Sequence, residues 1–308
     1  TNTIMAIAFS QDDKYILTGS FDKTVKLFEI ETGKEIRTFS GHAGFIASVA
    51  ISHDGANVVS GSSDRTIKIW NVATGKEINS LNHGHYSWQV AFSNNGRYVL
   101  ASSSTGIVKA WEIATGKERW SSPCWFFAIS PDSRFVVTSK FVDLRTSTLK
   151  LLDLNTGREF KSLTGSNYNA IKLSFSPDNR YVLVSDWDSS IRIYDITTGE
   201  EAASLIGFKD GEWMAMTSNG YFNASYKAGS YLTLQIGSNE YSLNNFYDVF
   251  FRPDIVAAKL KGEDISGLVT ITMKQAIQLP PPDVQIQPVQ KSESHQNITR
   301  VCYKTINT

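Results

Sequence analysis

The stretch that decides the fold of this chain is residues 41–72, GHAGFIASVAISHDGANVVSGSSDRTIKIWNV. It contains short runs of β-branched and aromatic residues, Ser48–Ile51 and Thr66–Trp70, which are typical of strands. Between them lies Asp54-Gly55, a pair that tolerates the left-handed backbone of a tight hairpin. The stretch therefore predicts short antiparallel strands joined by tight turns.

The end of this stretch, residues 68–72, has four further copies along the chain. The central residues of the five copies are separated by 42, 41, 41 and 42 positions, and a Thr-Gly pair follows each copy at the same intervals. The central residues are Phe28, Trp70, Trp111, Leu152 and Tyr194. Four short strands in every unit of about 41 residues predict the blades of a β-propeller, because such a blade buries its faces only against neighbouring blades.

Composition limits the classes of partner. The chain has 308 residues, of which 41% are hydrophobic, and 30 basic residues balance 30 acidic ones. A chain without net positive charge has no electrostatic footprint for nucleic acid or for an anionic membrane. No apolar run approaches the roughly 18 residues that a membrane helix needs. We therefore expect a protein or peptide partner, no nucleic acid, no membrane, and a cytoplasmic location.

Signals of catalysis or metal binding are weak. The two cysteines, Cys124 and Cys302, are too few for a disulfide framework or a cysteine zinc site. The chain has no phosphate-binding glycine loop. His83-Gly84-His85 has residue types that bind metals, but the spacing brings no carboxylate or thiol to it. We predict no catalytic residues, no metal and no cofactor, and hence a protein that is not an enzyme.

The repeats resemble the WD40 family. The second unit carries the resemblance with His42 after Gly41, then Ser60, Asp64 and Trp70, spaced as this family spaces its structural tetrad. The resemblance implies a relay in which the indole of Trp70 reaches Ser60, Ser60 reaches His42, and His42 reaches Asp64. In the third unit it implies His85, Ser102 and Trp111 at the matching positions, with Thr105 in place of the aspartate.

The same serine, histidine and aspartate have the residue types of a hydrolase triad. A catalytic serine needs an exposed hydroxyl beside an oxyanion hole. Inside a blade the three side chains would be buried and would satisfy one another's hydrogen bonds. We therefore interpret them as structural.

The fold class that follows is all-β: a WD40-type β-propeller with five clear four-stranded blades and a divergent sixth, then a short helical segment and a partial β tail. Rings of this family are usually closed by an N-terminal strand that pairs with the last blade, and Thr1 begins too late to supply it. We therefore expect truncation at the N-terminus, with at least one blade upstream. The predicted regions are a propeller over 1–242, a helical segment over 243–279 with helices at 244–251 and 254–261, and a proline-rich spacer with an incomplete β-domain over 280–308.

Large side chains gather at one set of repeat positions. By resemblance, the start of each innermost strand and the residue before the tetrad aspartate face the wide end of the central channel. Rings at such positions are common anchors for protein and peptide partners. We predict a partner-binding rim formed by Phe21, Phe45, Tyr86, Trp88, Trp125, Trp187, Asp210 and Glu212. The alternative is that Trp88 and Trp125 fill the channel or pack between irregular blades.

The stretch after the propeller is similar to one in bacterial multidomain WD40 proteins, which often carry a caspase-like peptidase domain in the same polypeptide. The matching residues are Gly211, Trp213, Gly220, Tyr221, Phe222, Phe251, Arg252, Pro253, Asp254 and Pro280–Pro282. The main hypothesis is a non-catalytic scaffold for protein–protein interaction. The alternative hypothesis is the sensor or regulatory region of a caspase-like cysteine peptidase whose catalytic domain, the effector, lies outside these residues.

Overall fold

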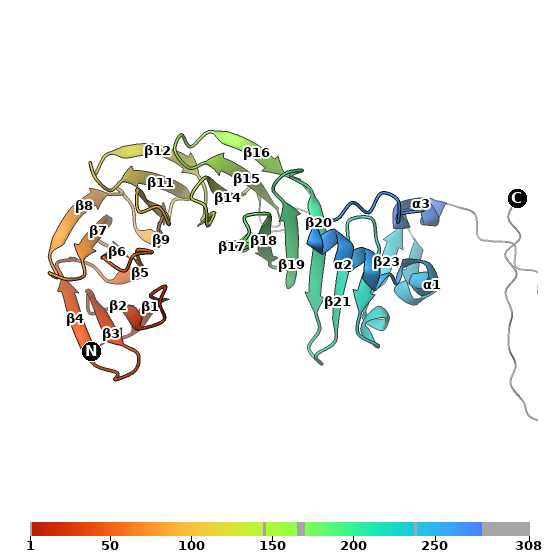
Figure 1. Cartoon of the computed structure of the whole chain (residues 1–308), viewed down its shortest axis with the longest axis horizontal. Helices are drawn as coiled ribbons and strands as arrows, with labels where there is room; N and C mark the ends of the chain where they lie inside the picture. Colours follow the sequence, from red (N-terminus) through yellow and green to blue (C-terminus); the bar gives the residue numbers. More distant parts are fainter. Residues whose placement is uncertain (1, 144–145, 165–169, 237–238, 279–308) are drawn as a thin grey trace, which may run out of the picture.

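The structure, a computed structural model, describes residues 2–143, 146–164, 170–236 and 239–278. Antiparallel strands dominate it, and within each sheet they follow one another in chain order. Figure 1 shows the sheets side by side in an arc, with the first strand of each on the concave side and the fourth on the convex side. In the part of the chain that is described, this arc stays open between the first sheet and the fifth (Figure 1).

Blades 1 to 4 are separate four-stranded sheets. Blade 1 contains β1 (Ile4–Phe9), β2 (Tyr15–Ser20), β3 (Thr24–Glu29) and β4 (Glu35–Ser40). Blade 2 contains β5 (Ile46–Ile51), β6 (Asn57–Ser62), β7 (Thr66–Asn71) and β8 (Glu77–Asn82). Blade 3 contains β9 (Ser87–Phe92), β10 (Tyr98–Ser103), β11 (Ile107–Glu112) and β12 (Glu118–Pro123). Blade 4 contains β13 (Phe126–Ile129), β14 (Phe135–Phe141), β15 (Ser147–Asp153) and β16 (Glu159–Leu163). These four sheets, with the fifth described next, confirm the predicted WD40-type all-β fold.

Blade 5 belongs to a larger sheet. Its strands are β17 (Ala170–Phe175), β18 (Tyr181–Asp186), β19 (Ser190–Asp195) and β20 (Glu201–Gly207). The sheet continues with β21 (Trp213–Thr217) and β22 (Phe222–Ala224), while β23 (Thr233–Ile236) and β24 (Asn239–Ser242) form a separate hairpin. The divergent sixth unit is thus present as strands, but its first two extend the outer edge of blade 5 instead of starting a new four-stranded sheet.

A serine-based turn begins the second strand of each blade. In blade 2, the Ser52 hydroxyl donates to Asp54 Oδ1 at 2.6 Å and accepts from the Asn57 amide at 2.9 Å. The same bonds recur at Ser10, Ser93, Ser130 and Ser176. Because a short polar side chain satisfies the turn's backbone locally, each unit encodes its own hairpin.

The hydrophobic core lies between the blades. Leu17 and Leu27 of blade 1 pack with Ile46, Val49 and Trp70 of blade 2 in one buried cluster. Equivalent clusters join blades 2 and 3, blades 3 and 4, and blades 4 and 5. Each sheet therefore buries its apolar side chains against its neighbours, as the repeat predicted.

Beyond the strands, the chain forms a small helical segment with its own core. The elements are η1 (Ala228–Tyr231), η2 (Leu243–Phe246), α1 (Tyr247–Phe250), α2 (Pro253–Lys261) and α3 (Met273–Gln278). The helix predicted over 254–261 is α2, and the one predicted over 244–251 is formed by η2 followed by α1. Helix α2 is capped by Gly262, whose φ of 75° is the left-handed value expected of a C-terminal cap. Around it, Met214, Tyr221, Phe222 and Phe250 are buried together.

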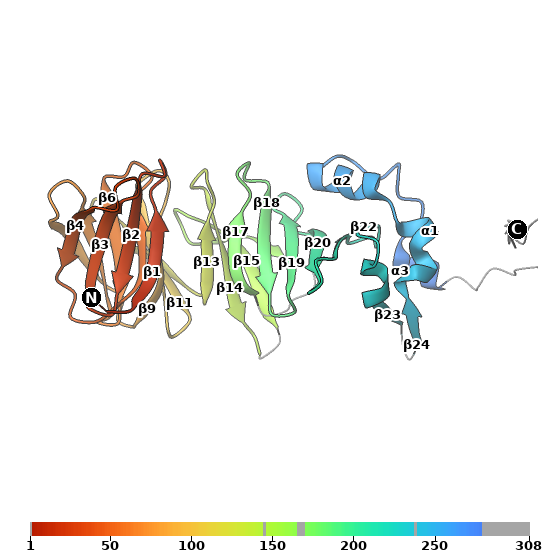
Figure 2. The same ribbon diagram turned by 90° about the horizontal axis from the view of Figure 1, so that it is seen from below.

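Helix α2 also covers part of blade 5. Its Leu260 packs with Tyr181 and Ile193, and Arg180 donates to the carbonyl of Gly262 at 2.9 Å. Figure 2 shows the helices gathered at the C-terminal end of the row of sheets. The predicted spacer and β-domain over 280–308 lie outside the described residues. Within the described ranges no helix has the length and apolar character to cross a bilayer.

Candidate partner-binding rim

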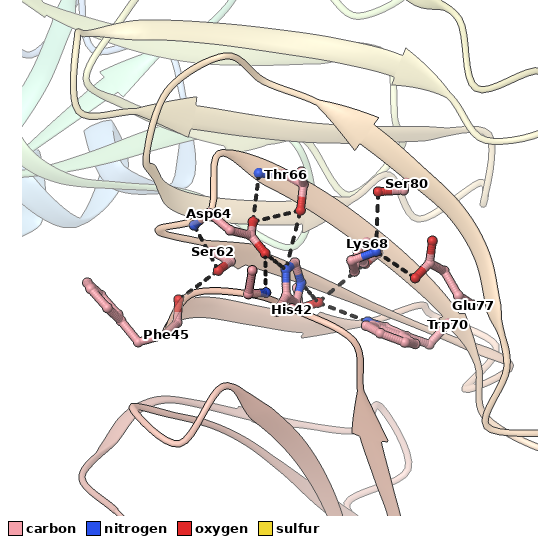
Figure 3. A network of polar contacts seen from close by, with 11 residues as sticks. His42, Phe45, Ser62, Asp64, Thr66, Lys68, Trp70, Glu77 and Ser80 are labelled. Atoms are coloured by element: carbon pink, nitrogen blue, oxygen red, sulfur yellow. Dashed lines mark hydrogen bonds and ion pairs between the residues drawn. The ribbon is translucent and has the colours of Figure 1, made fainter.

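The tetrad residues of blade 2 form one chain of hydrogen bonds (Figure 3). The Trp70 indole donates to Ser60 Oγ at 2.9 Å, and Ser60 Oγ lies 2.8 Å from His42 Nε2. His42 Nδ1 lies 2.7 Å from Asp64 Oδ2. Asp64 Oδ1 also accepts from the amide and the hydroxyl of Thr66, at 2.9 and 2.7 Å. The four side chains have the contacts that the resemblance implies.

The protonation states of His42 and Asp64 are consistent with this series of hydrogen bonds. Burial lowers the pKa of His42 despite the neighbouring Asp64, so the imidazole is neutral at pH 7. Burial tends to raise the pKa of Asp64, but hydrogen bonds from Thr66 and His42 outweigh it and lower this pKa to about 2. Neutral His42 thus donates from Nδ1 to the Asp64 carboxylate and accepts the Ser60 proton at Nε2.

This arrangement does not favour nucleophilic chemistry. Ser60 is fully buried, and its oxygen already accepts from Trp70. Cys124 is also buried, and burial raises the pKa of its thiol to about 12, which keeps it a poor nucleophile. Cys302 lies outside the described residues.

In blade 3 a different histidine takes the tetrad position. His83 is buried and meets the Trp111 ring edge-on at 5.5 Å, as His42 meets Trp70 at 6.0 Å, whereas His85 is exposed. The assignment of His85 was therefore wrong. Because Thr105 replaces the aspartate, His83 turns Nε2 to the Ala101 carbonyl at 3.1 Å, and Ser102 Oγ is buried without a partner. The 41-residue interval from His42 identifies His83 correctly.

The predicted rim residues share one end of the blades. In an antiparallel meander, the turn between the second and third strands and the link to the next blade lie at the same end. Phe21 and Trp187 occupy such turns, in blades 1 and 5. The links between blades contain Phe45, Tyr86 and Trp125. The link between β20 and β21 contains Asp210 and Glu212, and Trp88 lies near the start of β9. We call this end of the molecule the rim.

Six of the rings at the rim form a continuous series across four blades, which we call the aromatic ladder. Its members are Phe21, Phe45, Tyr86, Trp88, Trp125 and Phe141. Successive ring centroids lie 4.4, 5.5, 6.2, 6.1 and 5.8 Å apart. The two end pairs are stacked, and the middle rings meet at steep angles. Sequence reasoning missed Phe141 because a local insertion obscures its register.

The rings of the ladder are partly exposed, and the backbone that carries them is hydrogen-bonded. Phe21 and Trp88 are 42% and 46% exposed, while the other rings are partly buried. Backbone bonds tie the links to neighbouring turns: Ser63 N donates to Phe45 O at 3.0 Å, and Ser104 N to Tyr86 O at 2.8 Å. The rings therefore stand on backbone that is hydrogen-bonded within each blade.

The indole of Trp125 packs directly against Gly106. A Cβ atom at Gly106 would lie 2.8 Å from Cε2 of the indole, and the φ of this glycine is 70°. Both the close contact and the left-handed backbone require glycine. Trp125 thus leans from the start of blade 4 onto blade 3, which joins the two halves of the ladder.

Trp187 stands apart from the ladder. Its side chain is 69% exposed, and among the described residues no ring contact links it to the other aromatic residues. Arg192 holds the turn that contains Trp187, because it donates to Asp186 Oδ2 and to Asp188 Oδ2, each at 2.6 Å. The structure therefore brings five predicted aromatic residues together and places the sixth on blade 5.

Asp210 and Glu212 lie over the extension of blade 5. Asp210 Oδ2 accepts from the Tyr231 hydroxyl at 2.5 Å, and Glu212 Oε2 accepts from the Lys227 amide at 3.0 Å. Their carboxylates thus hold the link between β20 and β21 against Lys227 and the end of η1, which follow β22. Across the described ranges, no group of three or more histidine, cysteine or acidic side chains is placed to hold a metal ion.

Comparisons of the sequence with known proteins give a short match to individual proteins and a long match to a family model. A stretch of 38 residues is 55% identical to the "Probable E3 ubiquitin ligase complex SCF subunit sconB" of Arthroderma benhamiae and, equally, of Trichophyton verrucosum. This match covers 12% of the chain and 5% of the length of each relative.

A longer match extends over most of the strands. The family model described as the IFT122 first beta-propeller matches residues 3–234, which is 232 of the 308 residues. The matched range holds blades 1 to 5 with β21 and β22, so sequence and architecture agree. The chain belongs to the family of the IFT122 first β-propeller, a WD40-type β-propeller.

Proposed function

We propose that this chain is a non-catalytic scaffold that binds a protein or peptide partner on its rim. The observation that carries the proposal is the aromatic ladder, a continuous and partly exposed series of rings that spans four blades. Most of the other large apolar side chains of blades 1 to 3 pack between the sheets, although Ile4, Ile7 and Phe9 are exposed on the first strand. Large rings on a rigid base lose little conformational entropy on binding, which suits them to anchor a partner.

Two further facts support binding rather than catalysis. The serine, histidine and aspartate of blade 2 are occupied with one another, and the Cys124 thiol is protonated. The short match is to proteins whose name describes a subunit of a complex. Trp187, Asp210 and Glu212 widen the proposed surface toward blade 5. Regulation of a caspase-like peptidase stays a prediction, as does the cytoplasmic location.

The test compares partner capture with stability. We expect the double variant Trp88→Ala, Trp187→Ala to lose partners that the immobilised wild-type chain retains. Its melting temperature should stay within a few degrees of wild type, because the two side chains are 46% and 69% exposed and lie outside the core between the blades. Phe160→Ala is the matched control, since Phe160 is 57% exposed on an outer strand away from the rim. Retention of every partner by the double variant would contradict the proposal.

A further inference from the structure

Hydrogen bonding distinguishes the ladder from the tryptophans of the core. Trp70 and Trp120 donate their indole N–H groups to Ser60 Oγ and to the Leu154 carbonyl. In the described part of the chain, the indoles of Trp88 and Trp125 and the hydroxyl of Tyr86 have no such partner. Partial burial raises the pKa of the Tyr86 phenol, so its hydroxyl stays protonated and able to donate. The middle of the ladder therefore presents three donors.

Acceptors beside the ladder are already occupied. Asp22 accepts from Thr24, Asp64 accepts from Thr66 and Ala43, and Asp143 accepts from the Thr146 amide. Asp210 accepts at both oxygens, from the Glu212 amide and the Tyr231 hydroxyl, and Glu212 accepts from the Lys227 amide; both carboxylates lie over the extension of blade 5, beyond the ladder. A ligand that matches this surface needs hydrogen-bond acceptors and apolar groups, and it needs neither charge nor many N–H donors.

A proline-rich segment has this chemistry. Each proline offers a carbonyl acceptor and an apolar ring and has no N–H. The polyproline II helix forms no internal hydrogen bonds, so its carbonyls are free, and it is already ordered before binding. With three residues per turn and a rise of about 3.1 Å per residue, this helix presents a pyrrolidine ring about every 9.3 Å along each of its three edges.

From these matches we infer that the aromatic ladder binds a proline-rich peptide segment in the polyproline II conformation. The inference rests on the proposed function and adds to it the class of partner. Tyr86, Trp88 and Trp125 donate to carbonyls of the segment, and the rings of the ladder contact its pyrrolidine rings. Six rings at these separations fit a segment of roughly eight residues, at about 3.1 Å per residue.

The test uses two labelled peptides and fluorescence polarisation. We expect fluorescein-octaproline to bind the chain saturably, and an octapeptide of alternating glycine and serine to bind at least about tenfold more weakly, since it must lose chain entropy and bury N–H groups. Equal affinity for the two peptides, or no binding of octaproline, would overturn the inference.

Two sets of variants separate donors from rings. Trp88→Phe with Trp125→Phe keeps aromatic rings but removes both N–H donors, so octaproline should bind about tenfold more weakly at an unchanged melting temperature. Trp88→Ala with Trp125→Ala should abolish binding, and Phe160→Ala should leave it unchanged because Phe160 lies on an outer strand away from the rim. Unaltered binding by the phenylalanine pair would refute the role of the donors.

The outcome also distinguishes this inference from the broader proposal. If octaproline fails to bind while the ladder variants lose their captured partner, the rim binds a partner of another class and only the present inference fails. If the ladder variants keep their partner, the proposed function itself fails.

Discussion

At the scale of single residues, burial decides what Ser60 does. It has the neighbours of a hydrolase nucleophile, His42 at 2.8 Å and Asp64 beyond it. Yet it is fully buried, and its oxygen accepts the indole proton of Trp70. Buried polar groups that satisfy one another stabilise a fold, and their burial keeps a substrate from reaching them. Residue type alone could not distinguish these outcomes.

The tetrad predicts a pH dependence of stability. Because the pKa of Asp64 falls from 3.8 to about 2 in the folded chain, the fold favours the charged carboxylate. Its stabilisation is present above about pH 4 and is lost as the pH falls toward 2. We expect Asp64→Asn to lower the melting temperature at neutral pH, and this deficit to shrink as the pH is lowered from about 5 to about 2.5. Asp13→Asn, at an exposed turn, controls for the loss of one charge. A deficit that stays constant over this range would refute the assignment.

At the scale of strands, one ion pair recurs on the outer half of the blades. A lysine of the third strand pairs with a glutamate of the fourth: Lys26–Glu35, Lys68–Glu77, Lys109–Glu118 and Lys150–Glu159. In blade 5 the cation is Arg192, which lies 3.8 Å from Glu201 and also binds Asp186 and Asp188. The planar guanidinium spans several carboxylates, which a lysine cannot do. Arginine in place of lysine at this position of blade 5 therefore replaces a surface ion pair with a buried network next to the turn of Trp187.

This difference is measurable by substitution. Arg192→Met should cost about 3–5 kcal/mol of unfolding free energy, because it leaves Asp186, only 4% exposed, without its charge partner. Lys109→Met, at the same position of blade 3, should cost less than about 1 kcal/mol, because its pair is solvated. Chemical denaturation of both variants checks the prediction, and similar losses would show that the Arg192 network behaves as a surface pair.

At the scale of the whole molecule, stability comes from blade-on-blade packing. Ile46 pairs with Ser62 in blade 2 as Ile4 pairs with Ser20 in blade 1. Ile46 is fully buried against blade 1, whereas Ile4 is 54% exposed on the open side of the arc. Ile7 and Phe9 are exposed on the same strand. The same sequence position is thus core or surface according to whether a neighbouring sheet covers it.

A matched pair of substitutions measures this effect. Ile46→Ala should destabilise the chain by about 2–5 kcal/mol, because it leaves a cavity between blades 1 and 2. Ile4→Ala removes the same atoms from a largely exposed position and should change the unfolding free energy by less than about 0.5 kcal/mol. Equal losses in a denaturation experiment would mean that the open side of blade 1 is covered in solution.

Sequence by itself determined the repeat and most local elements. The 41-residue period predicted the blades because each unit carries its own strand patterns and serine-capped turns. Helix α2 was predictable because Pro253 begins it and Gly262 ends it, and both act on their own backbone. The positions of the predicted rim followed from register within a unit.

Contacts between units depended on the tertiary structure. Whether β21 begins a new blade or extends blade 5 depends on which sheet edge is free, and the pattern of a strand does not specify its neighbour. The ladder likewise joins side chains from four blades, and Phe141 enters it only because Trp125 leans back over Gly106. Strand and turn preferences act within a few residues along the chain. Ring contacts and burial depend on how closely packed sheets bring distant residues together, so only the assembled arc decided them.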